Sequence, residues 1–298
     1  MNLLEINEVS KHFNKTIAVD KLSLNIPKQS IFGLLGPNGA GKTSIILIIT
    51  AITMPDSGEV LLNGKRINFK DPSQIGYMPE ERGLYKKMKV GEQLLYLAQL
   101  KGMPTKVAKQ KLKYWLEKLD VLTWWDKRIE ELSKGMQQKI QFIATVVHDP
   151  RLLILDEPFS GLDPVNANLI KDEIYELKQK GTSIIFSTHR MEQVEEICED
   201  IALINHGKKI LGGNVQKIKQ DHKEHLYRLS FDNANVHDLT LQDLDIQAIE
   251  SNSLTVKMNK DMSSNEVITR MINRGIQIKS FNEILPSIND IFIKQVSN

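Results

Sequence analysis

Two kinds of apolar pattern run along this sequence. In residues 3–9 and 17–26, apolar side chains alternate with polar ones, which predicts two antiparallel strands with one buried face. Residues 30–35, 152–155 and 183–187 are instead short and almost wholly apolar. Runs of this kind are typical of strands buried on both faces of a parallel sheet.

The middle of the chain has a different texture. Residues 92–100 and 106–119 place apolar side chains at helical spacing, with lysines on the opposite face. We therefore predict a helical insertion at about 86–150. Outside it, strands alternate with helices, and this order favours an α/β domain with a parallel sheet and an antiparallel N-terminal part.

The sequence changes character near residue 214. Beyond that point glycine is absent except for Gly275. The patterns predict strands at 225–231, 254–258 and 277–281, and helices at 266–273 and 284–295. We expect a domain at 1–213 and a small α+β domain at 214–298, the second without a catalytic constellation.

Composition and charge limit the classes of protein to which this chain can belong. The chain has 298 residues, 41% apolar and 26% charged, which is ordinary for a globular protein. Its net charge of +2 gives no electrostatic argument for nucleic acid. The one cysteine excludes an intrachain disulfide and fits a reducing compartment. The N-terminus lacks a signal-peptide pattern, and the apolar run at 45–49 is far shorter than the ~20 residues of a membrane span, so a membrane role requires a partner.

A phosphate-binding loop is the strongest chemical signal. The pattern G-x-x-x-x-G-K-[ST] is matched by Gly36, Pro37, Asn38, Gly39, Ala40, Gly41, Lys42 and Thr43. It follows a predicted strand and opens a predicted helix, so backbone N–H groups and a helix N-terminus meet at one point. Lys42 can reach the β- and γ-phosphates, and the Thr43 hydroxyl can hold Mg²⁺. The alternative is a glycine-rich turn that binds no ligand. Such a turn would not require the lysine and threonine that complete the motif here.

Acidic and basic side chains follow the buried strands. Asp156 and Glu157 come at the end of the apolar run 152–155, and His189 follows the strand 183–187. Ligands of open α/β sheets bind at the carboxyl ends of strands. One carboxylate there can hold Mg²⁺ through water and the other can deprotonate an attacking water. A solvated strand end is the alternative.

Three weaker sequence features, at Ser133, Glu80 and Phe13, each allow two interpretations. Ser133, followed by Gly135, is an N-cap that can bind an anion or can merely begin a helix. Glu80 ends a predicted strand and can face a ligand or solvent. Phe13 can stack on a flat ligand or can be a half-buried aromatic.

Taken in order, these motifs resemble the ATP-binding subunit of ABC transporters over residues 1–213. The order is phosphate loop, Glu80 loop, serine–glycine signature, carboxylate strand, the 160–163 loop and His189. The tail looks like the C-terminal extension of the ATPases of sodium-extrusion and ABC-2-type exporters. The resemblance implies an α/β P-loop NTPase core with an antiparallel β subdomain, a helical insertion and a small C-terminal α+β domain.

The resemblance also implies roles in one half-site for ATP and Mg²⁺. Phe13 would stack on adenine, and the loop from Gly36 through Ser44 would wrap the phosphates, with Lys42 on the β- and γ-phosphates. Thr43, Asp156 and Glu80 would hold Mg²⁺. Glu157 would act as general base, and His189 would contact the γ-phosphate.

Other roles implied by the resemblance join two chains. Ser133 and Gly135 would face the γ-phosphate bound by a second ATP-binding subunit, most simply an identical copy. Asp163 would communicate across that interface. Lys134 and Met136 replace a glycine and the glutamine of the usual Leu-Ser-Gly-Gly-Gln signature, and Glu80 replaces the usual loop glutamine. Glutamate keeps an oxygen ligand but loses an amide donor, so coupling to the membrane partner is the role these departures affect most.

We therefore expect an ATPase subunit that energises a separate membrane-spanning permease, for export, from the cytoplasmic face of the membrane. The loop 80–90, with Tyr85, and the helical insertion would form the docking face. The alternative is an ABC-type ATPase in a process other than transport; such proteins usually carry a coiled-coil insertion or paired nucleotide domains, and neither pattern is present. A P-loop kinase and a module that holds ATP without cleaving it account for fewer of the motifs.

Overall fold

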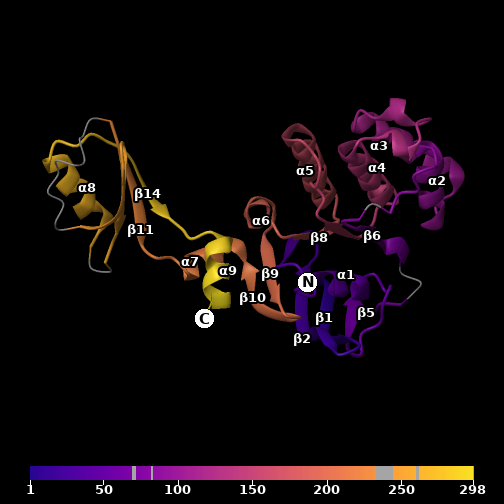
Figure 1. Ribbon diagram of the computed structural model, residues 1–298, viewed down its shortest axis with the longest axis horizontal. Helices are drawn as coiled ribbons and strands as arrows, with labels where there is room; N and C mark the ends of the chain where they lie inside the picture. Colours follow the sequence, from indigo (N-terminus) through magenta and orange to yellow (C-terminus); the bar gives the residue numbers. More distant parts are fainter. Residues whose placement is uncertain (69–71, 82, 233–243, 260–261, 298) are drawn as a thin grey trace. The chain divides into compact units, whose positions relative to one another are not determined.

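A computed structural model describes residues 1–68, 72–81, 83–232, 244–259 and 262–297. The chain divides into two compact units, Met1–Val215 and Gln216–Asn298. Figure 1 traces both units in sequence colours.

An antiparallel sheet opens the first unit, in the order β2-β1-β4-β5. Its strands are β1 (Asn2–Phe13), β2 (Thr16–Pro27), β4 (Ser57–Leu62) and β5 (Lys65–Arg66). The alternation predicted from the sequence is present, since Leu4, Ile6 and Leu24 are buried between polar neighbours. Phe13 ends β1 and is paired with Thr16, whereas the sequence pattern placed it after the strand.

A six-stranded sheet forms the centre of the first unit, in the order β10-β9-β3-β8-β7-β6. The strands are β3 (Ile31–Leu35), β6 (Ile75–Met78), β7 (Leu152–Asp156), β8 (Ser183–Thr188), β9 (Asp200–Asn205) and β10 (Lys208–Asn214). All neighbours are parallel except β10 with β9. Every residue of β3, β7 and β8 is buried, as predicted from their apolar runs, so the α/β fold class is confirmed. The carboxyl ends of these three adjacent strands therefore meet at one edge.

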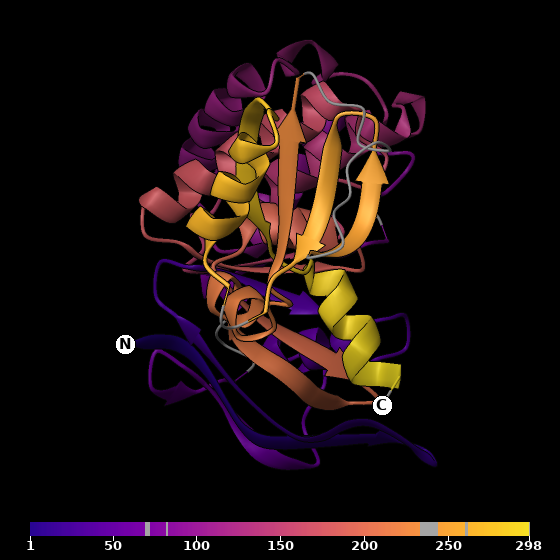
Figure 2. The same ribbon diagram turned by 90° about the vertical axis from the view of Figure 1, so that its left-hand side faces the viewer.

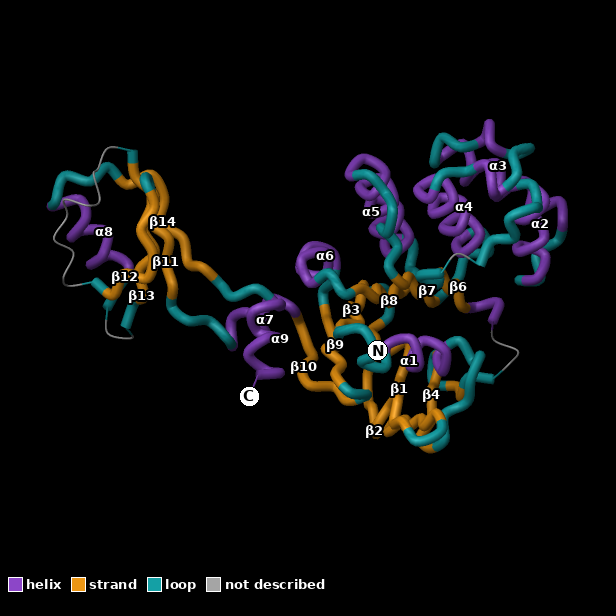
Figure 3. The backbone as a smooth tube through the Cα atoms, in the orientation of Figure 1, coloured by secondary structure: helices purple, strands orange, loops and turns teal. Residues whose placement is uncertain are grey.

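Helices cover both faces of the six-stranded sheet. Figure 3 shows α1 (Lys42–Ile49) on the side of the antiparallel sheet, and α5 (Pro164–Gln179) and α6 (Met191–Ile197) on the opposite side. Ile45, Ile46 and Ile49 of α1 belong to the core cluster shared with both sheets.

The helical insertion contains α2 (Val90–Leu100), α3 (Thr105–Lys118) and α4 (Lys134–Val146), with 3₁₀ turns at Leu122–Trp124 and Ile129–Glu131. A third 3₁₀ turn, Pro72–Gln74, precedes β6. Lys118 of α3 contacts both Glu173 and Glu176 of α5, which ties the insertion to the sheet's covering helix. Among the described residues, no helix combines the length and apolar character needed to cross a bilayer.

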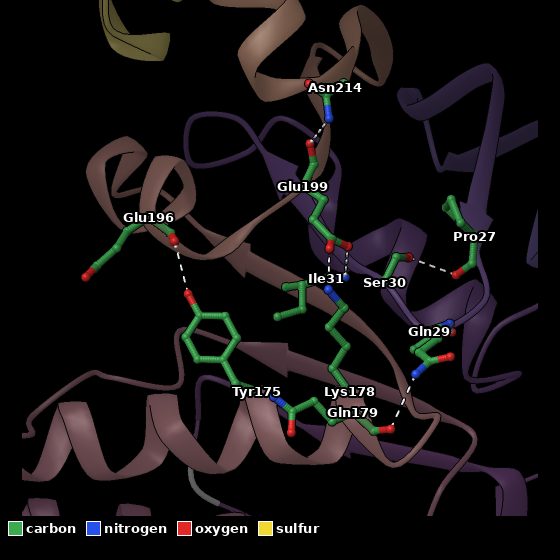
Figure 4. Close-up of polar contacts among 11 residues, drawn as sticks. Pro27, Gln29, Ser30, Ile31, Tyr175, Lys178, Gln179, Glu196, Glu199 and Asn214 are labelled. Carbon is green, nitrogen blue, oxygen red and sulfur yellow. Dashed lines mark hydrogen bonds and ion pairs between the residues drawn. The ribbon is translucent and has the colours of Figure 1, made fainter.

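Glu199 holds the start of the phosphate-loop strand in place (Figure 4). Its carboxylate accepts a hydrogen bond from the backbone N of Ile31 (3.3 Å) and pairs with Lys178 of α5. Its carbonyl accepts from the side chain of Asn214 (3.0 Å), at the end of β10. One side chain and its backbone thus join β3 to α5 and to the last strand of the sheet.

The second unit is an antiparallel sheet with helices, and it faces the viewer in Figure 2. Its order is β12-β13-β11-β14, formed by β11 (Leu226–Phe231), β12 (Asp245–Glu250), β13 (Ser253–Lys257) and β14 (Ile278–Ile284). The helices are α7 (Val215–Asp221, across the boundary), α8 (Ser264–Asn273) and α9 (Ile288–Ser297). Val267 and Met271 of α8 pack on Leu229 and Val256. The sequence pattern missed β12 and α7. β12 is an edge strand that is almost wholly exposed, so burial imposes no strict alternation of apolar and polar residues on it.

Candidate functional site

The phosphate loop has the conformation that its glycines permit. Gly36, Gly39 and Gly41 have φ of 149°, 78° and 107°, in the region that disfavours any side chain. A Cβ at Gly36 would lie 2.2 Å from the carbonyl O of Ile204, and one at Gly41 would lie 2.3 Å from that of Ala18. These residues let the chain turn tightly from β3 into α1.

Lys42 lies at the first position of α1 and bends back along the loop. Its Nζ donates to the carbonyl O atoms of Gly36 (2.7 Å) and Pro37 (3.1 Å). Burial lowers the pKa of Lys42, and the nearby Asp156, Glu157 and Glu80 oppose that shift. The ammonium is therefore oriented within the loop, beside the acids from other strands.

The end of β7 carries the two carboxylates. Asp156 is its last residue, and both Asp156 and Glu157 are buried. Glu157 has a φ of 50°, an uncommon conformation for glutamate that is held by its backbone N donating to the carbonyl O of Ser187 (2.9 Å). Its Oε2 accepts from Thr188 Oγ1 (3.0 Å), and its Oε1 accepts from the backbone N of His189 (2.8 Å).

One cavity of about 200 Å³ gathers several of the predicted residues. Its lining consists of Thr16, Ile17, Ala18, Asn38, Gly39, Ala40, Gly41, Lys42, Thr43, Ser44, Glu80, Asp156 and Glu157. The phosphate loop, the Glu80 loop and the end of β7 meet here because β3, β6 and β7 run in the same direction in one sheet, and β2 of the antiparallel sheet adds a further wall.

Other predicted residues lie outside this lining. Phe13 is 44% exposed, with the Lys11 ammonium 5.6 Å from its ring centroid. Its pairing partner Thr16 does line the cavity. His189 is also exposed, with its ring Nδ1 on Glu157 Oε1 at 2.7 Å.

The signature residues form a separate exposed corner. Ser133 is the N-cap of α4, and its Oγ accepts from the backbone N of Met136 (3.3 Å). A Cβ on Gly135 would lie 3.0 Å from the carbonyl O of Gly161, so the signature and the 160–163 loop are neighbours. Asp163 caps α5 by accepting from the backbone N of Val165 (3.0 Å). Hydrogen bonds, first from the Asn166 side chain, lower the pKa of Asp163.

The charges in the cavity are unequal in number. Lys42 faces three carboxylates, those of Glu80, Asp156 and Glu157. Burial raises the pKa of Asp156, and Glu157 and Glu80 add to the shift. A cation beside these acids would relieve the repulsion and would also offset the charge of incoming phosphates.

The donor set fits Mg²⁺ shared with phosphate oxygens. Among the described residues, no three His, Cys, Asp or Glu side chains are placed to hold a metal by themselves. Mg²⁺ is commonly held by one or two protein oxygens together with water and substrate phosphates. Thr43, Asp156 and Glu80 line the cavity and supply oxygen atoms of this kind.

Sequence reasoning missed two groups of residues. Thr16, Ile17 and Ala18 form a wall of the cavity, and their only sequence signal was their place at the start of an apolar alternation. Gln138 is buried in α4 and donates to the carbonyl O atoms of Pro158 (2.9 Å) and Glu157 (3.3 Å). A glutamine in a helix gives no sequence signal for such a contact.

Comparison with known proteins agrees with this geometry. The family model for ABC transporters matches residues 19–160, and the model for the C-terminal domain of DrrA1-3-like ATP-binding proteins matches residues 213–296. The ABC transporter ATP-binding protein YhaQ of Bacillus subtilis is 42% identical, covering 99% of this chain and 98% of its own.

Two further relatives have names that state a biological role, and solved structures share the fold. The Nod factor export ATP-binding protein I of a Rhizobium species is 32% identical, covering 74% of this chain and 73% of its own. The linearmycin resistance ATP-binding protein LnrL of Bacillus subtilis is 34% identical, covering 71% and 69%. A solved ATP-binding subunit of an ABC transporter has a TM-score of 0.68 at 27% identity, covering 74% of this chain and 92% of its own.

Proposed function

This chain belongs to the family of ABC transporter ATP-binding proteins, and from that premise we propose that it hydrolyses ATP to drive export through a separate membrane-spanning permease. As a family member it binds ATP and is an ATPase that works with a membrane permease. The observation that carries the proposal is the single cavity in which the phosphate loop meets Glu80, Asp156 and Glu157.

The proposed roles within one half-site follow from position. Gly36 to Ser44 would bind the phosphates; Asn38 to Ser44 line the cavity, whereas Gly36 and Pro37 lie outside its lining. Lys42, held on the Gly36 carbonyl, would neutralise the β- and γ-phosphates from inside the loop. Glu157 takes a proton from the attacking water, while His189 orients Glu157 and meets the γ-phosphate. Phe13, at the rim formed by the β1–β2 hairpin, stacks on adenine. Catalysis of this type is positioning and charge stabilisation, without a covalent intermediate.

Mg²⁺ would be held by Thr43, Asp156 and Glu80 together with phosphate oxygens. When bound, it supplies positive charge to the phosphoryl oxygens. Glu80 lacks the amide of a glutamine and adds a negative charge to the cavity. We propose that this substitution makes nucleotide binding more dependent on the cation than it would be with glutamine.

A second copy of the chain completes each half-site in this proposal. Ser133 and Gly135 lie at an exposed helix start outside the cavity of their own chain. An exposed N-cap hydroxyl at a helix start fits a phosphate presented by a neighbour. The adjacent Asp163 would carry the signal across the interface. Because ATP contacts both chains, dimerisation depends on ATP.

The permease would dock on the loop 80–90 and the helical insertion. Tyr85 in this loop is 55% exposed and packs edge-on against Tyr96, with ring centroids 6.4 Å apart. We propose that the chain is held at the cytoplasmic face of the membrane by this contact. The name of the Nod factor relative supports export. The match of the tail to the DrrA1-3-like C-terminal domain supports the ABC-2-type part of the expected sodium-extrusion and ABC-2-type group. Residues 1–213 would be the motor and 214–298 an accessory domain.

The experiment is co-purification and reconstitution of the full chain. The tagged protein is recovered from detergent-solubilised membranes, and the retained membrane-spanning protein is reconstituted with it in vesicles. The expected result is Mg²⁺-dependent ATP hydrolysis stimulated by that protein. Tyr85→Asp should abolish the stimulation and leave ATP binding intact, whereas Ile272→Asp, an exposed control in α8 outside the proposed docking face, should leave the stimulation unchanged. ATP hydrolysis without any retained membrane protein would contradict the transport role.

A further inference from the structure

Two buried glutamines connect the signature helix to both carboxylate-bearing strand ends. Gln138 and Gln141 lie three residues apart in α4, so they project from one face of the helix. Gln138 is 2% exposed and Gln141 is 4% exposed. The Gln138 amide donates to the carbonyl O atoms of Glu157 and Pro158, and the Gln141 amide donates to that of Pro79, so α4 contacts the loops that follow both β7 and β6.

The first contact holds the backbone next to Glu80. Gln141 Nε2 lies 2.8 Å from the carbonyl O of Pro79. The peptide group is planar, so the carbonyl of Pro79 and the N–H and Cα of Glu80 move together. Proline also fixes its own φ, which removes one of the rotations available at this point. Holding the Pro79 carbonyl therefore sets where the backbone of Glu80 lies.

The second contact supports Glu157. Gln138 Nε2 lies 2.9 Å from the carbonyl O of Pro158 and 3.3 Å from that of Glu157. Glu157 has the positive φ of 50°, a conformation that persists only when its surroundings hold it. Gln138 is one of those surroundings, together with the Ser187 carbonyl on the other side.

An unmatched atom sets Gln141 apart from an ordinary core residue. Its Oε1 is buried without a hydrogen-bond partner, which costs free energy that an apolar side chain of similar size would not. A residue selected only for packing would avoid that cost. The donated bond to Pro79 is the contact that an apolar side chain would lose.

We propose that Gln141, with Gln138, is a positioning residue that couples the two ATP sites of the dimer. This rests on the proposed function, in which Ser133 at the start of α4 meets the nucleotide of the partner chain. A shift of α4 on that contact is carried by Gln141 to Glu80 and by Gln138 to Glu157. Occupation of the partner's site then aligns the acids of the chain's own site, which is a coupling between sites through one rigid element.

The test compares Gln141→Leu with Gln137→Leu in the full chain. Gln137 is in the same helix, but its Nε2 donates to Ile129 (3.2 Å) and Leu132 (2.9 Å), inside the insertion. Gln141→Leu should keep ATP affinity, lose the sigmoidal dependence of hydrolysis on ATP, and lower kcat by about tenfold, the scale of one lost hydrogen bond. Gln137→Leu should retain the sigmoidal dependence.

A second measurement separates this inference from the proposed function. The backbone N–H of Glu80 should exchange faster with solvent in Gln141→Leu than in the parent, with ATP absent. The exchange measurement does not require ATP hydrolysis. If the parent protein failed to cleave ATP, the proposed function would be wrong, but the exchange rate at Glu80 would still test the hydrogen bond from Gln141 to Pro79. Gln141→Met, which keeps an unbranched side chain, guards against a variant that does not fold. Parental exchange at Glu80, or parental sigmoidal kinetics, in both variants would overturn the coupling role.

Discussion

One oxygen of Glu157 is held twice by His189. Glu157 Oε1 lies 2.8 Å from the backbone N of His189 and 2.7 Å from its ring Nδ1. Since a carboxylate only accepts, this contact assigns the proton to Nδ1 of His189. Thr188 Oγ1 donates to the other carboxylate oxygen at 3.0 Å. The end of β8 therefore orients the acid that follows β7.

Replacing the proposed general base separates binding from turnover. Glu157→Gln keeps the size of the side chain but cannot accept a proton, so kcat should fall by roughly 100-fold or more, the usual scale for a lost general base. ATP binding should persist, and the ATP-bound dimer should accumulate. Phosphate release and gel filtration with ATP measure the two effects. Exposed Glu192→Gln is the matched control, and unchanged turnover in Glu157→Gln would remove this residue from the base role.

An arginine at Ser133 should block the dimer. The residue is exposed at the start of α4, where a long cation would occupy the space of the partner's nucleotide. ATP binding by the monomer should stay near parental affinity. Ser133→Ala loses the N-cap, at a cost of about 1 kcal/mol in stability, but adds no bulk. If both variants dimerised equally well with ATP, Ser133 would not lie at the interface.

Buried Asp156 should make stability depend on pH. Burial raises its pKa above the ordinary 3.8, so the folded chain holds this proton more tightly than the unfolded chain. The loss of folding stability caused by ionising the buried carboxyl is absent below pH 3.8 and grows as the pH rises towards the raised pKa. Asp156→Asn should therefore raise the unfolding midpoint by roughly 2–4 °C at about pH 7, the response to a change of about 1 kcal/mol, without nucleotide or Mg²⁺.

The pH comparison has a matched control. Asp172→Asn alters an exposed carboxylate of α5, so its unfolding midpoint should follow the parent at each pH. The gain in Asp156→Asn should disappear near pH 3.8. A midpoint in Asp156→Asn that falls below the parent at neutral pH would show that the ionised carboxylate stabilises the fold instead.

Two glycines of the phosphate loop should respond unequally to alanine. At Gly36 a Cβ would lie 2.2 Å from the Ile204 carbonyl, so Gly36→Ala must displace backbone and should cost on the order of 4 kcal/mol or more. Gly39 has a positive φ, but nothing lies within 4 Å of its added Cβ. Gly39→Ala should cost about 1 kcal/mol, the conformational term alone. Urea unfolding measures both, and equal costs would refute the steric argument at Gly36.

The sequence alone predicted much of the architecture. Alternation in β1 and β2 and the apolar runs of β3, β7 and β8 are direct consequences of which faces each strand buries, so they are readable locally. The end of β1 and the whole of β12 escaped for the same reason, and α7 was missed as well. Phe13 extends β1 through pairing with Thr16, and β12 is an exposed edge strand, so neither leaves an apolar period.

The residue types of the candidate site were also readable, because a phosphate loop and strand-end acids have local patterns. Their meeting was decided by tertiary structure. The parallel order of β3, β8 and β7 brings Lys42 and Glu157 to one edge, and the β2 wall closes the cavity from another sheet. The bonds from Gln138 and Gln141 to distant carbonyls had no sequence signal, since a carbonyl is the same in every residue and only packing decides which one a buried amide meets.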